Sequence, residues 1–240
     1  MKQIFIIADI HLGDTSPLNP EKAKLNFIKF LTDLPDNSVL FVLGDLFNFF
    51  LMKNCKILFG DTDILRLLHN CTERGISISI FSGNHDFWIG KFLKKYNINF
   101  IRFNKSIFYR GKRILLSHGD LYFNGSKLIS LINLFSKTFI FYIIVYFFPE
   151  DLLKIFIRFI SKRERNLVKI KNPYIEYCKR NNNYDIFILG HYHTTDIIKC
   201  NNSYIVVPGD FATKNTYIKI LNDKLYIIKN KNILKTLEIS

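Results

Sequence analysis

The sequence predicts an α/β protein in which two β-sheets lie between layers of helices. Three observations favour this fold class: apolar runs rich in β-branched and aromatic residues, helix-length segments between the early runs, and close spacing of the late runs. Strands that alternate with helices pair in parallel, whereas closely spaced strands form hairpins. We therefore expect parallel strands early in the chain and antiparallel strands late.

The predicted elements follow one another along the 240 residues without an internal repeat. The predicted strands are residues 3–9, 39–45, 76–86, 106–120, 186–193, 204–210, 217–221 and 225–229. The predicted helices lie near residues 20–34, 60–74 and 88–96. This length suits one large domain with an insertion, so we expect a core of residues 1–123 and 172–240 and an inserted segment of residues 124–171.

Composition limits the class of protein and of partner. The 48% hydrophobic and 15% aromatic content argues against disorder, and the formal charge of +14 favours anionic partners such as phosphates, nucleic acid or an anionic membrane face. A general bias toward Lys, Asn, Ile and Phe could also raise the surface charge. The four cysteines have no C-x-x-C spacing, which gives no indication of a zinc knuckle or a disulfide framework. The first apolar run is too short for a signal peptide, so we expect a cytoplasmic protein.

Residue types that bind metals follow five of the predicted strands. Sites in open α/β sheets form just beyond the carboxyl ends of strands, so these residues are expected to converge. A single Gly-Asp after a strand is usually a turn or a helix cap, but five of the six histidines of the chain lie in these motifs. The motifs are Asp9-x-His11, Gly44-Asp45, Gly83-Asn84-His85-Asp86, His118-Gly119-Asp120 and Gly190-His191-Tyr192-His193.

Carboxylates and neutral imidazoles without thiolates suit Mn²⁺, Fe²⁺ or Zn²⁺ in a catalytic site. Two metal ions roughly 3.5–4 Å apart require a bridging ligand, which a carboxylate can be. Such a pair polarises a phosphoryl group and lowers the pKa of bound water, giving a nucleophile near neutral pH. The pattern therefore indicates a two-metal hydrolase.

In order and spacing, the motifs D-x-H, G-D, G-N-H-D, H-G-D and G-H-x-H resemble those of the calcineurin-like metallophosphoesterases. The resemblance covers most of the chain outside the inserted segment and implies a four-layer α/β/β/α sandwich. It implies that the first metal is held by Asp9, His11 and His193, the second by Asn84, His118 and His191, and both by a bridging Asp45. It makes His85, Asp45 and Asn84 the catalytic residues, with His85 stabilising phosphoryl oxygens or protonating the leaving group.

One position departs from this pattern. Many members of the family have an acid three residues after the bridging aspartate, oriented toward the catalytic histidine, where this chain has Asn48. An amide does not favour an imidazolium as a carboxylate would. We therefore expect His85 to act as a hydrogen-bond donor more than as a strong acid.

The inserted segment is both the most apolar and a strongly basic part of the chain. Residues 121–171 contain nine basic and three acidic residues, and a ten-residue apolar run ends at Phe148. Pro149 and the acids after it indicate a helix start, and the helix that follows would carry a stripe of Lys154, Arg158 and Lys162. The run is too short for a membrane span. Two buried helices that extend the core, or a helical hairpin that contacts acyl chains or bilayer, remain as interpretations.

The apolar and basic insertion makes the chain similar to the UDP-2,3-diacylglucosamine pyrophosphohydrolases of lipid A biosynthesis. The stretches that carry this similarity are ADIHLGD, GDLFNFF, GNHDFWIG, SHGDLY and VVPGDF. It implies hydrolysis of UDP-2,3-diacylglucosamine to UMP and 2,3-diacylglucosamine 1-phosphate by a monomer with two metal ions, preferably Mn²⁺. It also implies a peripheral position on the inner face of the inner membrane and a lid over the site. Substrate contacts are expected from Ser161, Lys162, Arg165 and Asn166.

Two departures set this chain apart from well-known members of that subgroup, which carry Arg at the position of His85 and acids near Asn124. A metallophosphatase or a phosphodiesterase, including a nuclease, is therefore the alternative. The aromatics lie within an Ile/Leu run, which favours lipid over nucleic acid, so we expect no nucleic-acid partner. A non-catalytic scaffold on this fold would have lost metal ligands, and here every ligand position is filled.

Overall fold

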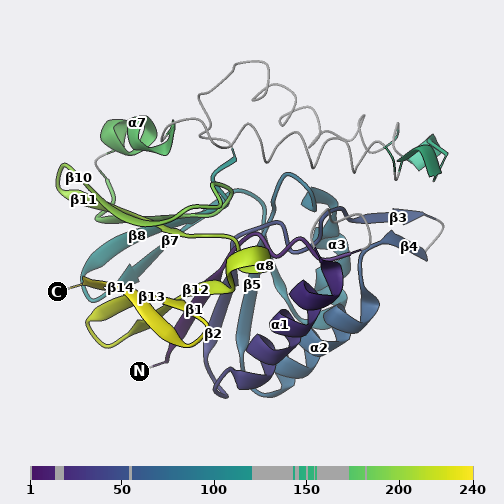
Figure 1. The fold of residues 1–240 in the computed structure, drawn as a ribbon, viewed down its shortest axis with the longest axis horizontal. Helices are drawn as coiled ribbons and strands as arrows, with labels where there is room; N and C mark the ends of the chain where they lie inside the picture. The colour runs from purple at the N-terminus through teal and green to yellow at the C-terminus, as the bar shows by residue number, and fades with distance from the viewer. Residues whose placement is uncertain are drawn as a thin grey trace.

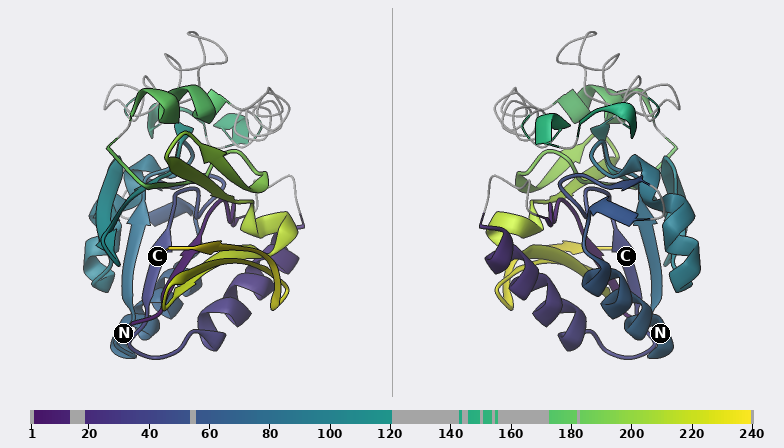
Figure 2. Two further views of the ribbon diagram at one scale, coloured as in Figure 1. Left: turned by 90° about the vertical axis from the view of Figure 1, so that its left-hand side faces the viewer. Right: turned by 90° about the vertical axis from the view of Figure 1, so that its right-hand side faces the viewer.

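The fold is a four-layer α/β/β/α sandwich, as the sequence predicts (Figure 1). The computed structural model describes residues 2–13, 19–53, 56–120, 143, 146–149, 151–153, 155, 173–181 and 183–239. Two sheets lie face to face in the middle of the molecule. Figure 2 shows α7 (Pro173–Arg180) and α1 (Pro20–Asp33) on opposite sides of this pair.

The first sheet has seven strands and confirms the change from parallel to antiparallel pairing. Its order is β14-β13-β12-β1-β2-β5-β6, with β1 to β2, β2 to β5 and β5 to β6 parallel and the β12–β14 end antiparallel. Its strands are β1 (Ile4–Ile7), β2 (Val39–Val42), β5 (Ser77–Phe81), β6 (Asn99–Ile101), β12 (Thr216–Leu221), β13 (Lys224–Lys229) and β14 (Asn232–Glu238).

The second sheet has five strands in the order β10-β11-β9-β8-β7. Its strands are β7 (Asn104–Tyr109), β8 (Lys112–Ser117), β9 (Ile186–Leu189), β10 (Thr195–Cys200) and β11 (Ser203–Pro208). The prediction of one long strand over 106–120 is wrong, because the chain turns back between β7 and β8. Arg110 and Gly111 have φ of 52° and 76°, the signature of a tight two-residue hairpin turn.

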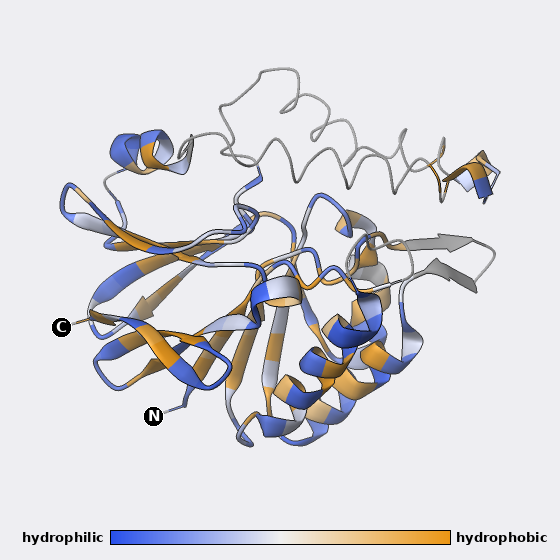
Figure 3. Ribbon diagram, viewed as in Figure 1, coloured by the Kyte–Doolittle hydropathy of each residue, from blue (hydrophilic) through white to orange (hydrophobic). Residues whose placement is uncertain are grey.

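Two of the predicted helices form where their caps and apolar spacing indicate. The Asn19 side chain accepts a hydrogen bond from the Lys22 amide at the start of α1, and Asp61 caps α2 (Thr62–Glu73) in the same way. Figure 3 shows both helices alternating between hydrophobic and hydrophilic residues, as expected for helices that cover one face of a sheet. The predicted helix 88–96 is instead three short turns, η1 (Phe87–Ile89), α3 (Gly90–Leu93) and η2 (Lys94–Tyr96).

The sequence-based prediction does not include several short elements. These are the hairpin of β3 (Leu51–Lys53) and β4 (Lys56–Phe59), the strands β6, β10 and β14, and the helices α7 and α8 (Phe211–Lys214). All of them are only three to eight residues long, which gives little room for a periodic pattern.

Apolar side chains fill the three spaces between the four layers. The space between the sheets contains fully buried aliphatic residues such as Ile6, Ile188 and Ile218. A second cluster lies under α1 and α2, around Phe27, and a third lies under α7, around Phe187. Because these clusters fix the strands from both sides, the loops at the strand ends are held on a rigid frame.

The inserted segment lies mostly outside the described residues. Residues 151–153 are helical, and the Leu153 amide donates to the Pro149 carbonyl over 3.0 Å, which confirms the predicted helix start. In the described part of the chain, no helix has the length and apolar character of a membrane span. The predicted domain limits stay predictions, and the Lys154, Arg158 and Lys162 stripe falls among residues that are not described.

Candidate metal centre

Every predicted metal ligand lies just beyond the carboxyl end of a strand. Strand β1 leads to Asp9 and His11, β2 to Asp45, β5 to Asn84 and His85, β8 to His118, and β9 to His191 and His193. Because the two sheets face each other, strands from both of them deliver side chains to the same place. The prediction that the five motifs converge is therefore confirmed.

Asp9, His11 and His193 form the first cluster. One potential ligand atom from each lies within 4.8 Å of the others. The rings of His11 and His193 are stacked, with centroids 5.3 Å apart. The buried Asp9 carboxylate accepts the His191 amide at Oδ2 over 2.9 Å, while its Oδ1 accepts no hydrogen bond from the described residues. That second oxygen has the environment of a metal ligand.

The Asp45 carboxylate lies at the centre of the site. Its Oδ2 is 3.9 Å from Nε2 of His11, 3.8 Å from Nε2 of His85 and 3.5 Å from Nε2 of His118. Asp45 belongs to two three-residue clusters, one with His11 and His85 and the other with Asp9 and His118. One carboxylate shared between clusters is the arrangement that a bridging ligand requires.

His118 and Asn84 form the second side of the site. Nδ1 of His118 donates to the Leu43 carbonyl over 2.7 Å, which leaves Nε2 of the neutral ring with a lone pair. That Nε2 lies 3.0 Å from Oδ1 of Asn84. Two electron-rich atoms at this separation are expected around a shared cation. The His191 ring packs against His118, with centroids 5.1 Å apart.

His85 is oriented by the backbone. Its Nδ1 lies 2.9 Å from the carbonyl oxygen of Asn48, and its amide donates to Oδ1 of Asp45 over 3.1 Å. A carbonyl oxygen accepts, so Nδ1 carries the proton and Nε2 faces Asp45. The oxygen that orients the histidine thus comes from the main chain of Asn48 and not from its side chain.

The buried carboxylates of the site would be stabilised by a bound cation. Burial, followed by the nearby carboxylates of Asp45 and Asp210, raises the pKa of Asp9 well above its usual range. Two carboxylates buried close to each other would be unfavourable in their charged form without a cation. The donor set of carboxylates, imidazoles and one amide oxygen fits divalent metal ions.

The backbone at the site is locally strained. Five of the seven predicted ligand residues have left-handed φ: Asp9 (55°), His11 (49°), Asp45 (52°), His191 (66°) and His193 (52°). This conformation costs a residue with a side chain on the order of 1 kcal/mol. Strain of this kind, concentrated at one place, is typical of a functional site.

Glycines let the ligand loops approach one another closely. A Cβ on Gly83 would lie 1.8 Å from Oδ1 of Asp45, and one on Gly44 would lie 2.7 Å from Nδ1 of His118. Only a residue without a side chain fits at either position. The glycines beside the ligands in the sequence motifs are therefore part of the site.

The sequence-based prediction of site residues misses two buried acids that support the ligands. Asp86 accepts from the amides of Leu46 (2.7 Å) and Gly83 (3.0 Å), and so ties the Asp45 loop to the Asn84 loop. Asp210 caps α8 and lies 3.8 Å from Nδ1 of His193. Burial opposes ionisation of Asp210, but His193 and the neighbouring Thr213 and Lys214 outweigh it and hold its pKa below the usual range. The signals for both acids are present in the stretches GNHD and VVPGDF.

The four predicted substrate contacts in the inserted segment are not placed by the structure. Ser161, Lys162, Arg165 and Asn166 all lie outside the described residues. Their proximity to the metal ligands therefore stays a prediction.

Known proteins resemble this chain in both sequence and fold. The family model of the calcineurin-like phosphoesterases matches residues 2–195. The UDP-2,3-diacylglucosamine hydrolase of Wigglesworthia glossinidia brevipalpis is 26% identical over 242 residues, which cover 95% of this chain and 94% of that enzyme. Those of Histophilus somni and Aeromonas salmonicida are 32% and 36% identical, and with them the chain matches only about half of each relative's length (50% and 46%).

Solved structures share the fold at low sequence identity. A single-mutant form of Vps29 from Entamoeba histolytica superposes with a TM-score of 0.51 at 13% identity, covering 99% of both chains. An archaeal phosphodiesterase superposes with a TM-score of 0.50 at 13% identity, covering 95% of this chain and 99% of that one. At these identities the likeness concerns the fold alone.

Proposed function

The chain belongs to the calcineurin-like phosphoesterases, a family of metal-dependent phosphoester hydrolases, and from this premise we propose that it hydrolyses the pyrophosphate bond of UDP-2,3-diacylglucosamine. The products would be UMP and 2,3-diacylglucosamine 1-phosphate. The observation that carries the proposal is the near full-length match to a hydrolase of that name. The inserted segment, which is apolar and basic at once, suits a substrate with acyl chains and phosphates.

We assign the metal ligands from the two sides of the site. Asp9, His11 and His193 would hold one ion, Asn84, His118 and His191 the other, and Asp45 would bridge them. The unsatisfied Asp9 oxygen and the facing Nε2 and Oδ1 atoms of His118 and Asn84 support this division. Mn²⁺ is our preferred ion, with Fe²⁺ or Zn²⁺ compatible with the same donors.

Bound divalent ions supply Lewis acidity and lower the pKa of coordinated water. The side chains of this protein orient the reaction around that chemistry. Asp45 is held by the His85 amide, and His118 is held in one tautomer by the Leu43 carbonyl. The Asn48 carbonyl fixes the Nδ1 proton of His85, so that its Nε2, when protonated, can donate to a phosphoryl oxygen or to the leaving group.

The described part of the inserted segment supports contact with acyl chains or with the surface of a bilayer. Phe147 is 75% exposed and Ile155 is 65% exposed, and Phe148 and Leu152 near them are exposed as well. Large apolar side chains gathered in one short stretch are typical of an interaction surface. We propose that this segment forms a lid that rests on the inner face of the inner membrane, with Ser161, Lys162, Arg165 and Asn166 contacting the substrate, and that the enzyme is a monomer.

The test is hydrolysis by the Mn²⁺-loaded protein, with UDP-2,3-diacylglucosamine and bis-p-nitrophenyl phosphate compared at equal concentration. We expect release of UMP from the lipid substrate with the higher kcat/KM. Asp45→Ala should lose activity by about a thousandfold or more, because both ions lose a ligand. Asp223→Ala, which removes an exposed aspartate paired with Arg110, is the matched control and should keep full activity.

A metallophosphatase or phosphodiesterase for another substrate is the second candidate. It is favoured by His85, which stands where members of the lipid A subgroup carry arginine. Efficient turnover of the diester, or of single-stranded DNA, together with inert UDP-diacylglucosamine would select this candidate and reject the first. Loss of both activities in Asp45→Ala would still support the metal assignment.

A further inference from the structure

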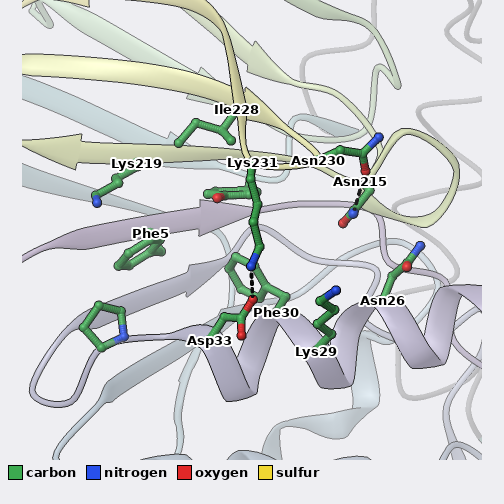
Figure 4. A pocket seen from close by; sticks show the side chains of 12 residues that line it. Phe5, Asn26, Lys29, Phe30, Asp33, Asn215, Lys219, Ile228, Asn230 and Lys231 are labelled. Carbon is green, nitrogen blue, oxygen red and sulfur yellow. Dashed lines mark hydrogen bonds and ion pairs between the residues drawn. The ribbon is translucent and has the colours of Figure 1, made fainter.

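A cavity lies on the helix-covered side of the seven-stranded sheet, beside the C-terminal half of α1 (Figure 4). It is open to solvent on one side and has a volume of about 670 Å³, within the range of small-molecule sites. None of the predicted metal ligands lines it. Figure 4 shows its lining side chains coming from α1, from β1 and from the β12–β13–β14 meander.

Aromatic rings form the floor of this cavity. Phe30 of α1 and Tyr217 of β12 meet with centroids 5.1 Å apart, and Phe5 of β1 lies 6.3 Å from each of them. Tyr217 is only partly buried, so part of its ring is available to a ligand. Phe30 meets Tyr217 edge to face, with ring planes 60° apart, so a flat heterocycle could stack on the exposed face of Tyr217 alone.

Lysines line the walls. Lys231 makes an ion pair across the cavity with Asp33, Nζ to Oδ2 2.9 Å, as Figure 4 shows. Lys29 and Lys219 also line the cavity and make no ion pair with any described residue. With three ammonium groups against one carboxylate, the cavity carries positive charge that no described acid neutralises. This charge favours an anionic ligand.

Lys231 has a backbone conformation that its residue type disfavours. Asn230 and Lys231 form the two-residue turn between β13 and β14 with φ of 48° and 72°. Asparagine is common at the first position of such a turn and glycine at the second, so a lysine at the second is strained. This strained backbone conformation directs the Lys231 ammonium group over the cavity. We infer that Lys231 is kept at this position because it acts in the cavity.

Amide groups complete one end of the cavity. The Asn215 side chain donates to Oδ1 of Asn230 over 2.9 Å, and both residues line the wall. Asn26 of α1 lines the same end, beside them in Figure 4. Amides supply both donors and acceptors, which suits the polar edge of a base or a sugar.

We propose that this cavity is a binding site for a mononucleotide, with the base on the exposed part of the Tyr217 ring and the phosphate held by Lys219 and Lys231. The aromatic side chains would contact the base, the lysines would bind the phosphate, and the amides would form hydrogen bonds with the polar edges of the base and the sugar. The proposal is independent of the substrate of the metal centre, because it rests on residues that the metal centre does not use.

Equilibrium dialysis of AMP, adenosine and inorganic phosphate against the Mn²⁺-loaded protein tests the ligand class. We expect AMP to bind more tightly than either fragment. Lys219→Ala and Lys231→Gly should each weaken AMP binding roughly tenfold, as expected when a charged hydrogen bond is lost. Lys235→Ala removes an exposed lysine of β14 that does not line the cavity, and it should change AMP binding less than twofold.

Lys231→Gly also separates binding from folding. Glycine suits the left-handed position, so this variant should unfold at the wild-type temperature or above, and it should keep wild-type hydrolysis at the metal centre. Wild-type AMP affinity in both lysine variants would overturn the proposal, as would equal affinity for AMP and inorganic phosphate.

Photo-crosslinking with 8-azidoadenosine 5′-monophosphate locates the site. Peptide mapping of the Mn²⁺-loaded protein should find the label in residues 215–231, and excess AMP should prevent it. Label only on peptides that carry metal ligands, such as His85 or His191, would show that the nucleotide binds the metal centre alone and would overturn the proposal.

Discussion

Ile188 and His191 are three residues apart on the same chain segment, yet they lie in regions with opposite properties. Ile188 is fully buried between the sheets in regular β9, among aliphatic neighbours with no polar group to satisfy. His191 lies beyond the strand with φ of 66°, beside the buried carboxylate of Asp9. The interior between the sheets stabilises the fold, whereas the metal centre uses some of that stability to hold charged groups in strained positions.

Gly83→Ala should have the largest effect of the substitutions, a loss of activity and of bound metal at the metal centre. The added Cβ would lie 1.8 Å from Oδ1 of Asp45 and 2.5 Å from its amide nitrogen, so the central carboxylate must move. We expect kcat/KM to fall by about a thousandfold, because Asp45 is the carboxylate that we propose as the bridge between the two ions. Metal content by mass spectrometry should fall with it.

Gly111→Ala is the matched control for loss of a glycine. Gly111 also has left-handed φ, but a Cβ added there would have no other atom within 4 Å, and the β7–β8 turn that contains it is at the opposite end of β8 from His118. The activity of this variant should be that of wild type, with a small loss of stability. Equal loss of activity in the two variants would mean that the close approach at Gly83 is not what matters.

Ile188→Ala should do the reverse and reduce stability while leaving the chemistry intact. It removes fully buried methylene and methyl groups from the space between the sheets, which costs about 3 kcal/mol. Urea unfolding measures the loss. At temperatures where the variant is folded, its kcat/KM should remain near that of wild type, and a large fall would show that the interior and the metal centre are coupled.

The stability of the metal-free protein should depend on pH through the metal centre and not through the apolar interior. Burial and the charge of Asp45 raise the pKa of Asp9, so the folded state binds a proton more tightly than the unfolded state does. This stabilisation is complete below the unfolded pKa and is lost as pH rises through the folded one. Asp9→Asn should show a weaker loss of stability between pH 4 and pH 8, measured by urea unfolding at each pH.

Metal provides the control for this experiment. Excess Mn²⁺ should raise the stability of wild type at pH 8 more than that of Asp9→Asn, since that variant has lost a proposed ligand of one of the two ions. Identical pH profiles for the two metal-free proteins would contradict the account of Asp9.

The smallest expected effect is on the chemical reactivity of Cys178, which lies in an apolar part of the interior. Cys178 belongs to α7 and is buried against the five-stranded sheet, and this burial raises the pKa of its thiol to about 12, so the reactive thiolate is almost absent at pH 8. Maleimide should leave Cys178 unlabelled in the native protein and label it in guanidinium chloride, as peptide mass mapping would show. Rapid native labelling would mean that the layer under α7 opens readily.

The sequence predicts those parts of the fold that depend on chemistry at strand ends. Asp9, Asp45 and His118 can be placed together because each follows an apolar run typical of a strand, and parallel strands end at one edge. The β7–β8 turn cannot be predicted, since Arg110 gives no sign that it adopts left-handed φ. Short elements such as β6 and α8 depend on tertiary contacts more than on their own few residues.

The supporting interactions of the site are harder to predict than its ligands. The expectation for His85 rests on the Asn48 side chain, but the structure places the Asn48 carbonyl against Nδ1. Backbone groups have the same chemistry in every residue, so no substitution pattern reveals them. The role of Asp210 depends on a contact with His193 that only the folded chain creates.

We expect the five left-handed residues at the candidate metal centre to tie the amount of folded protein to the supply of metal in the cell. Ions that bind only the folded state raise its population, and the strained loops make that contribution larger relative to the stability of the metal-free chain. When metal is scarce, a greater share of new chains stays open to proteases. We expect the steady-state level of this protein to fall under metal limitation even when its synthesis is constant.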